Sequence, residues 1–211
     1  MGKILMIGIN HNDPFGREKV YDVLRKESTF IPDCIAVEWG KIVAEKLISQ
    51  RKEFYELASA KYPLSTPEDL QLLSDAIAFE ADAHQTLYPQ LPIIWLDDKR
   101  NVSPKILATY LQDRLAIYEQ YGLRNDRLIA KNVADYVYSL TEEPDHRSGG
   151  ERDEIFYCEI IDALNRGHNN IICVVGATHA SLDIKDSFAS KLREASHNVI
   201  VYDTTQRHES I

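Results

Sequence analysis

Two tetrapeptides of one pattern, Gly-x-x-His, carry the residues of this sequence best suited to chemistry. The first runs from Gly8 to His11 and the second from Gly176 to His179. Histidine is the side chain whose ordinary pKa lies nearest neutrality, so it serves both as a general base and as a ligand of divalent metals. Glycine permits a tight turn and lets a ligand approach the backbone. The two turns therefore predict one site to which both histidines contribute.

A carboxylate that ends an apolar run is the expected third member of this site. Glu38 comes directly after Ile35-Ala36-Val37. Two histidines and a glutamate suit a catalytic divalent metal such as zinc, manganese or cobalt. They also suit a metal-free site in which the carboxylate orients a histidine that activates water. The alternatives are that Glu38 caps a helix beginning near Gly40 and that each histidine only bonds to the backbone of its turn.

Further polar residues stand where they could support the site. Glu80 interrupts an apolar stretch and would share a helix face with His84 at i,i+4, as a supporting pair or as a solvated face. Asp97 and Asp98 end a third apolar run, where one of them could orient a histidine or an arginine. Arg152 opens a helix and could stabilise an oxyanion, the alternative being an ordinary charged first turn.

Four residues are assigned to the lining of the ligand or cofactor site, namely Gly8, Gly176, Glu80 and Asp97. The remaining histidines have no partner at ligand spacing and are predicted to be surface or structural residues: His84, His146, His168, His197 and His208. The three cysteines are predicted to be reduced, buried and structural, with no chemistry of their own: Cys34, Cys158 and Cys173.

The elements that must position these residues are short apolar strands alternating with helices. The predicted strands are 3–8, 34–38, 92–96, 170–175 and 198–202. Their nearly continuous apolar character is typical of a mostly parallel sheet covered by helices on both faces. Ligands bind at the carboxyl ends of such strands, so the two histidines and Glu38 are expected at one edge. The order strand, Gly-x-x-His, helix, strand, acid recurs and ends first at Glu38 and then at Asp203, which leads us to hypothesise two related βαβ halves.

Several helices have readable ends. A cap and a proline at 65–69 predict a helix to about residue 87. Others are expected at 103–121, from residue 125 or 126 onward, and at 151–166, where Gly167 would end the helix. The polar segment 141–150 is predicted to be a flexible loop, and the tail after Asp203 to be frayed. A single α/β domain is expected, with a helical insertion at about 66–140.

Composition narrows the classes of partner. The chain has 211 residues and a formal net charge of -9, from 33 acidic and 24 basic side chains. This charge disfavours nucleic acid and anionic membrane surfaces. No apolar run approaches the roughly 20 residues of a membrane span, and the first residues do not read as a signal peptide. We therefore expect a cytoplasmic protein with a small-molecule or peptide substrate, and we allow for a homodimer.

The order of these motifs resembles the TraB/PrgY/Tiki group, which belongs to a broader superfamily with erythromycin esterases and ChaN-like haem-binding proteins. The matching segments are Gly8-x-x-His11, Pro32-Asp33-x-Ile35-x-Val37-Glu38, Glu80, Ile93-Ile94-Trp95-Leu96-Asp97, Glu151-Arg152-Asp153 and Val174-Val175-Gly176-Ala177-Thr178-His179. The resemblance implies two related halves with the site between them and, in Tiki-like members, a divalent-metal-dependent peptidase activity.

By motif, the resemblance assigns the site to four residues, namely His11, Glu38, His179 and Arg152. The arginine is ambiguous, because the segment from Arg124 through Arg127 to Asn132 looks like an element of the esterase branch. The membrane segments of many relatives are missing, and Ala180-Ser181-Leu182 replaces the usual Leu-Gly run after the second motif.

The leading hypothesis is a metal-assisted hydrolase of peptide or ester bonds, with His11, Glu38 and His179 as metal ligands and Arg152 as oxyanion stabiliser. One alternative is a metal-free esterase that uses the same histidines and glutamate. Another is a non-catalytic protein that binds haem or a small ligand, for which any of 11 tyrosines could ligate iron. A third is a structural or regulatory module that kept the fold and lost the activity.

Overall fold

The chain is built on a five-stranded sheet in which all strands run parallel. The computed structural model describes residues 2–11, 13, 15–63, 65–97, 116 and 149–205. The strands in this part are β1 (Lys3–Ile9), β2 (Cys34–Val37), β3 (Ile93–Trp95), β4 (Asn170–Gly176) and β5 (Asn198–Asp203). They lie in the order β3-β2-β4-β1-β5. The predicted α/β fold is confirmed, and each strand agrees with its predicted bounds to within one residue at either end.

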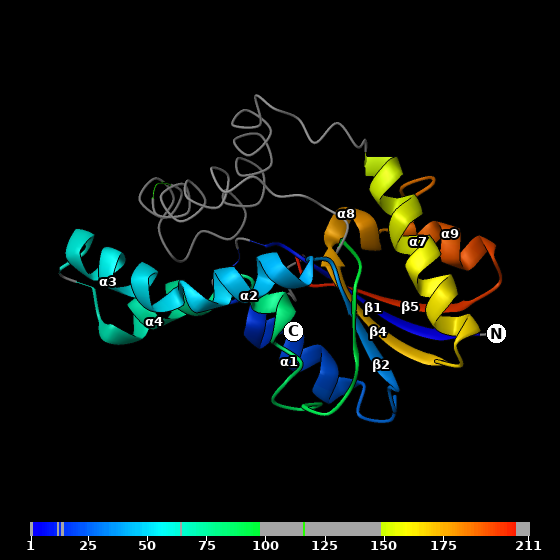
Figure 1. Ribbon diagram of the computed structural model, residues 1–211, viewed down its shortest axis with the longest axis horizontal. Coiled ribbons are helices and arrows are strands. Elements are labelled where there is room, and N and C mark those ends of the chain that lie inside the picture. Colours follow the sequence, from blue (N-terminus) through cyan, green and yellow to red (C-terminus); the bar gives the residue numbers. More distant parts are fainter. Residues whose placement is uncertain are drawn as a thin grey trace, which may run out of the picture.

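Helices cover both faces of this sheet (Figure 1). Successive side chains of a strand point to opposite faces, so Ile4 and Met6 of β1 face one layer and Leu5 and Ile7 face the other. The first layer contains α7 (Gly149–Asn165), α8 (Ala177–Ala180) and α9 (Phe188–Glu194). The second contains α1 (Gly16–Lys26). The near-continuous apolar runs follow from this double burial, as predicted.

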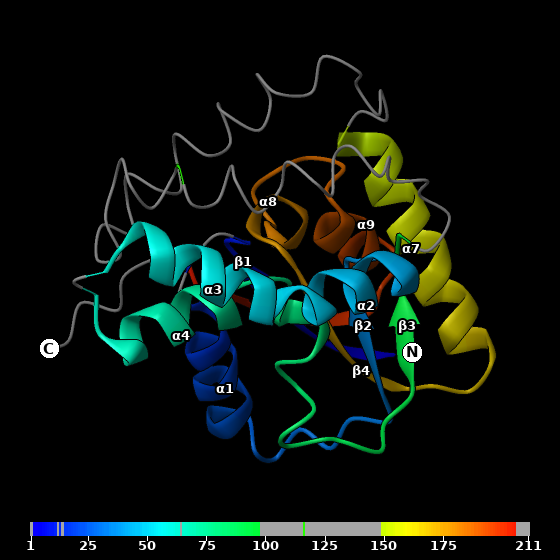
Figure 2. The same cartoon turned by 60° about the vertical axis from the view of Figure 1, so that its left-hand side comes forward.

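Three further helices extend to one side of the sheet after β2 (Figures 1 and 2). They are α2 (Lys41–Ser49), α3 (Arg51–Lys61) and α4 (Pro67–Asp75), and they share an apolar cluster of their own. The start of α4 is as predicted, because Thr66 accepts a hydrogen bond from the Asp69 amide at 3.2 Å and Pro67 occupies the first turn.

The end of α4 differs from the prediction of a helix to about residue 87. The helix stops at Asp75, Ala78 has a left-handed φ of 48°, and the 3-10 turn η1 (Phe79–Ala81) follows. The four residues from Ala76 to Phe79 are all fully buried, whereas an amphipathic helix would bury only one stripe of them. The guanidinium of Arg51 also binds the Ile77 carbonyl, at 3.0 and 2.6 Å. The segment is therefore drawn into the interior as a turn.

The helix before β4 is close to its prediction. It begins at Gly149, so the last two residues of the expected 141–150 loop are helical, and it ends before Gly167, whose φ is +102°. The expected helices at 103–121 and from residue 125 or 126, the rest of that loop, and the tail beyond residue 205 lie outside the described residues. Among the described helices, none combines the length and apolar composition needed to cross a bilayer.

The two-halves hypothesis stays a prediction. The sheet order places β1 and β4 side by side at the centre, with β2 beyond β4 and β5 beyond β1. An axis between β1 and β4 would exchange these pairs. The acidic residues of the repeat differ, however, since Asp203 is exposed and accepts hydrogen bonds from the amide and hydroxyl of Thr205.

Candidate active site

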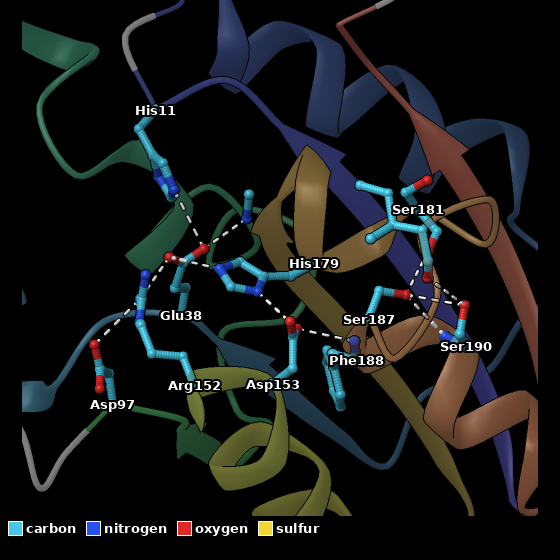
Figure 3. Close-up of polar contacts among 12 residues, drawn as sticks. His11, Glu38, Asp97, Arg152, Asp153, His179, Ser181, Ser187, Phe188 and Ser190 are labelled. Atoms are coloured by element: carbon cyan, nitrogen blue, oxygen red, sulfur yellow. Dashed lines mark hydrogen bonds and ion pairs between the residues drawn. The ribbon is translucent and has the colours of Figure 1, made fainter. Parts of the chain in front are cut away.

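The structure gathers the predicted residues at the carboxyl ends of the strands (Figure 3). His11 follows β1, Glu38 follows β2, Asp97 follows β3, and His179 lies in α8 directly after β4. The Nε2 atom of His11 is 3.2 Å from Oε2 of Glu38, and the Nε2 atom of His179 is 3.7 Å from Oε1 of Glu38. The side chain of Glu38 thus lies between the two imidazoles.

Glu38 is fixed by the backbone as well as by side chains. The Gly176 amide donates to its Oε2 at 2.6 Å, and Nη2 of Arg152 donates to its Oε1 at 2.7 Å. Burial acts to raise the pKa of Glu38, but the neighbouring His11, Arg152 and His179 outweigh it and hold this pKa well below its usual range. Glu38 is therefore an ionised carboxylate in the interior. The helix-cap interpretation is wrong, because the N-cap of α2 is Gly40, with no side-chain cap.

The ring of His179 is oriented by a carboxylate on α7. Its Nδ1 lies 2.7 Å from Oδ1 of Asp153, and the same oxygen accepts the Phe188 amide hydrogen at 2.8 Å. An ionised carboxylate only accepts hydrogen bonds, so Nδ1 of His179 carries the proton and Nε2 is turned toward Glu38. The rings of Phe156 and His179 pack in an edge arrangement, with centroids 5.1 Å apart.

His11 is oriented in the same way by a different carboxylate. Its Nδ1 is 2.6 Å from Oε1 of Glu80, which is fully buried and also accepts the indole N–H of Trp39. Burial lowers the pKa of His11, but Glu38 and Glu80 together raise it to about 10. The side chain keeps 31% of its surface exposed, so the ring is reachable from solvent.

Glu80 reaches His11 because the turn that carries it is tied down from two sides. Asp82, two residues later, accepts Nη1 of Arg51 at 2.5 Å and Nη2 of Arg17 at 2.6 Å. These contacts join η1 to α3 and α1. The predicted i,i+4 pair of Glu80 with His84 is wrong, since the segment is not an α-helix; His84 is buried elsewhere, and desolvation lowers its pKa to about 4.

Arg152 lies on the Glu38 side of the site rather than at an open position. Its Nη2 donates to Glu38 and also to Oδ2 of Asp97 at 3.2 Å, and the guanidinium stands 5.2 Å from the centre of the Phe156 ring. This placement makes Arg152 a clamp on two buried carboxylates. Arg124, Arg127 and Asp98 lie outside the described residues, so the choice between arginines stays open.

The two motif glycines have different surroundings. A methyl group on Gly176 would lie 3.1 Å from Nε2 of His11 and 3.2 Å from Oε2 of Glu38, so its missing side chain leaves room for the site. A methyl group on Gly8 would lie 2.9 Å from Cβ of Ala180 and 3.2 Å from Cα of Ala177. Gly8 therefore serves the close packing of β1 against α8, and the predicted lining role fits Gly176 only.

Formal charges among the described residues of this site do not balance. Four carboxylates bind a site histidine or the guanidinium of Arg152, which is the one arginine among these described contacts; they are Glu38, Glu80, Asp97 and Asp153. Even with His11 counted as protonated, this described group carries two excess negative charges. Such a site attracts protons and cations.

Some site residues were not singled out from sequence. Asp153 stands beside Arg152, and its place on the first turn of a predicted helix was the signal that could have indicated it. Trp39 follows Glu38, but nothing in the sequence pattern indicated that it contributes to the site. Two other predictions need correction. Cys158 is exposed, although Cys34 and Cys173 are buried as predicted. His168 does have a partner, because its Nδ1 lies 3.5 Å from Oδ1 of Asp33.

The three candidate metal ligands, His11, Glu38 and His179, lie close together, but their ligand atoms do not surround a common metal position. Within the described residues, a group whose ligand atoms all lie within 4.8 Å of one another is found at Asp33, Cys34 and His168, at the other edge of the sheet. His11 and His179 instead approach opposite oxygens of Glu38. When the chain was compared with family models, curated proteins and solved structures, nothing matched.

Proposed function

We propose that this chain is a metal-assisted hydrolase of ester or peptide bonds, with His11, Glu38 and His179 as the metal ligands. One observation carries the proposal: each imidazole has its Nδ1 on a carboxylate of its own, Glu80 or Asp153, while its Nε2 faces Glu38. Histidines that bind metals are oriented in this way, because the second carboxylate fixes the ring and raises its basicity.

The hydrogen atoms available to the two rings support a cation here. A neutral imidazole has one N–H and one lone pair. The Nδ1–H of His179 donates a hydrogen bond to Asp153, so the lone pair of Nε2 is directed at Glu38. Both nitrogens of His11 face carboxylate oxygens, so a neutral ring also sets one lone pair against an oxygen. One extra proton on His11 would relieve only one of these contacts, whereas a cation beside Glu38 relieves both.

The donor set fits a divalent metal in type. Donor atoms that share a tetrahedral ion at the usual bond lengths lie about 3.4 Å apart, whereas Nε2 of His11 and Nε2 of His179 lie 3.2 and 3.7 Å from different oxygens of Glu38, so the three side chains would have to close around the ion. Zinc, manganese and cobalt all accept two imidazoles and one carboxylate. Such an ion would polarise a substrate carbonyl and bring the pKa of bound water to about 7.

The residues of the chain have separate tasks in this proposal. Arg152 and the Gly176 amide hold Glu38 in place and keep it ionised. Asp153 fixes the tautomer of His179, so that only Nε2 of this ring is available to the site. Glu80 orients the ring of His11, which is partly exposed and can be reached from solvent. The resemblance to the TraB/PrgY/Tiki group, itself a proposal, agrees with these roles.

A metal-free esterase is the second candidate for the same site. This candidate is favoured because both oxygens of Glu38 already accept hydrogen bonds, one from Arg152 at 2.7 Å and one from the Gly176 amide at 2.6 Å. In that case the pair of Asp153 and His179 acts as the base that activates water, and the protonated His11 supplies positive charge near the developing oxyanion.

Hydrolysis and metal binding measured together distinguish the candidates. The protein is stripped with a chelator, assayed on a panel of esters and peptides, and assayed again after addition of Mn²⁺, Co²⁺ or Zn²⁺, alongside His179→Ala. The control is His197→Gln, since His197 accepts the Gly2 amide hydrogen away from the site. The proposal predicts that hydrolysis requires added metal, that it is lost in His179→Ala, and that it is retained in His197→Gln. Full activity after stripping would select the metal-free candidate, and no turnover under any condition would refute both.

A further inference from the structure

A second cluster of metal-ligating side chains lies where β2 and β4 begin, at the edge opposite the candidate active site. Asp33 and Cys34 stand at the start of β2, and His168 comes two residues before β4. One ligand atom from each lies within 4.8 Å of the others. Because neighbouring parallel strands begin at the same edge of a sheet, the fold brings together residues that are distant in sequence.

The carboxylate of Asp33 is fixed with one oxygen toward the cluster. Its Oδ2 accepts the amide hydrogens of Asn169 at 2.7 Å and Asn170 at 3.1 Å, and the Asp33 amide donates to the Asn170 carbonyl at 2.9 Å. Its Oδ1 is buried and makes no hydrogen bond of normal geometry among the described residues, although it lies 3.5 Å from Nδ1 of His168. A buried oxygen without a well-formed hydrogen bond is costly, and this one lies beside a thiol and an imidazole.

The backbone of His168 is held by the fold, and its side chain is partly exposed. Gly167, in its left-handed conformation, ends α7, and the His168 amide donates to the Ala163 carbonyl at 3.2 Å. The imidazole is 29% exposed, with Nδ1 3.5 Å from Oδ1 of Asp33. Cys34, by contrast, is fully buried. The cluster thus joins a fully buried thiol to an imidazole that solvent can reach.

We propose that Asp33, Cys34 and His168 bind a divalent transition metal of the zinc class, at a site separate from His11 and Glu38. A thiolate, an imidazole and a carboxylate are the ligands that zinc takes in proteins, with water in the fourth position. Bond lengths of about 2.0–2.3 Å set the donor atoms around an ion roughly 3.3–3.8 Å apart, so the three ligand atoms, which lie within 4.8 Å of one another, would close slightly on binding.

The ion would join the start of β2 to the junction between α7 and β4. Its thiolate distinguishes it from the candidate active site, whose ligands are nitrogen and oxygen only. The role expected from its position is stabilisation of the sheet, since an ion that binds only the folded chain adds its binding free energy to folding. This proposal does not depend on hydrolase activity.

Cobalt titration of the full chain, stripped and reduced, tests the site. Co²⁺ bound to a thiolate gives a charge-transfer absorption in the near ultraviolet that nitrogen and oxygen ligands do not give. We expect this band to saturate at one ion per chain and to disappear on addition of Zn²⁺, which binds such ligands more tightly than Co²⁺. The band should be lost in Cys34→Ser, greatly reduced in His168→Asn, and unchanged in Cys158→Ser.

The matched variants decide the outcome. Cys158 is an exposed thiol outside the cluster, so a band that vanishes in Cys158→Ser and survives in Cys34→Ser would overturn the proposal, as would no band in the unmodified chain. His168→Asn changes a partly exposed residue and keeps the test valid if Cys34→Ser fails to fold, which circular dichroism would reveal. Loss of the cobalt band leaves hydrolysis at His179 unaffected, so the two proposals fail independently.

Discussion

The pair of variants Gly8→Ala and Gly176→Ala separates folding from function within one sequence motif. Gly176 is the last residue of β4 and Gly8 the last but one of β1, and each precedes a histidine by three positions. A methyl group at Gly8 would meet Cβ of Ala180 at 2.9 Å and the backbone of Ala177 at 3.2 Å. At Gly176 it would meet side-chain atoms of the site, at 3.1 and 3.2 Å. The same substitution therefore has different consequences at the two turns.

The expected changes in stability and in metal affinity depend on which atoms the added methyl group would displace. Replacing glycine by alanine in a compatible conformation adds about 0.4–1 kcal/mol of stability by restricting the unfolded chain, whereas overpacking a rigid interior costs about 1–3 kcal/mol. At Gly8 the obstacle includes backbone, so a net loss of about 1–2 kcal/mol is expected. At Gly176 side-chain tips give way by a few tenths of an ångström, and the two effects nearly cancel. Displacing His11 and Glu38 should weaken metal affinity about 10- to 100-fold, as changes around ligands do.

Equilibrium unfolding in urea and calorimetric metal titration measure the two effects on the same preparations. We expect Gly8→Ala to shift the unfolding midpoint and keep its metal affinity, and Gly176→Ala to do the reverse. If Gly176→Ala binds metal as tightly as the unmodified chain, the site does not lie where His11 and Glu38 converge. If Gly8→Ala leaves stability unchanged, the assignment of Gly8 to packing against α8 is wrong.

Three further results are expected. Asp153→Asn should lower hydrolysis about 10- to 100-fold with little change in KM, because an amide oxygen can still accept the Nδ1–H of His179 but no longer supplies the negative charge that makes Nε2 a stronger ligand; an unchanged pH profile and rate would exclude that role. In the chelated protein, the pKa of His11 is raised from 6.5 to about 10, so its stabilising contribution is complete below pH about 6.5 and is lost as pH rises toward 10. After allowance for screening of a partly exposed ring, we expect the free energy of unfolding to fall by about 1–3 kcal/mol over this pH range, and by less in Glu80→Gln. Urea unfolding measured across the range tests this: if the free energy of unfolding falls equally with pH in the unmodified chain and in Glu80→Gln, the reasoning is wrong. Arg51→Ala should cost about 2–4 kcal/mol and also weaken metal binding, which a purely local role would leave intact.

The strands and their shared edge were predictable because they depend on local signals. Apolar runs of the right length, each followed by glycine or a carboxylate, are properties of the sequence itself, and the parallel arrangement then places His11, Glu38 and His179 together. The ending of α4 was not predictable in the same way. It depends on Arg51 reaching the Ile77 carbonyl, a contact that exists only once α3 has packed.

The partners of the histidines could not be predicted for the same physical reason. Glu80 reaches His11 only because a 3-10 turn replaces the expected helix. Without that helix, Glu80 and His84 no longer share a helix face. His168 approaches Asp33 only through the neighbouring starts of β2 and β4, a pairing that depends on strand order. Sequence spacing indicates which residues share an element, whereas these contacts depend on how elements far apart in the chain are assembled.

The most direct test of the central claim is anomalous diffraction from crystals grown with Mn²⁺ or Co²⁺, recorded at the absorption edge of the metal. The proposal predicts an anomalous peak about 2.0–2.2 Å from Nε2 of His11, Nε2 of His179 and a carboxylate oxygen of Glu38. The absence of a peak between these residues, with Glu38 still bonded to Arg152 and to the Gly176 amide, would contradict it.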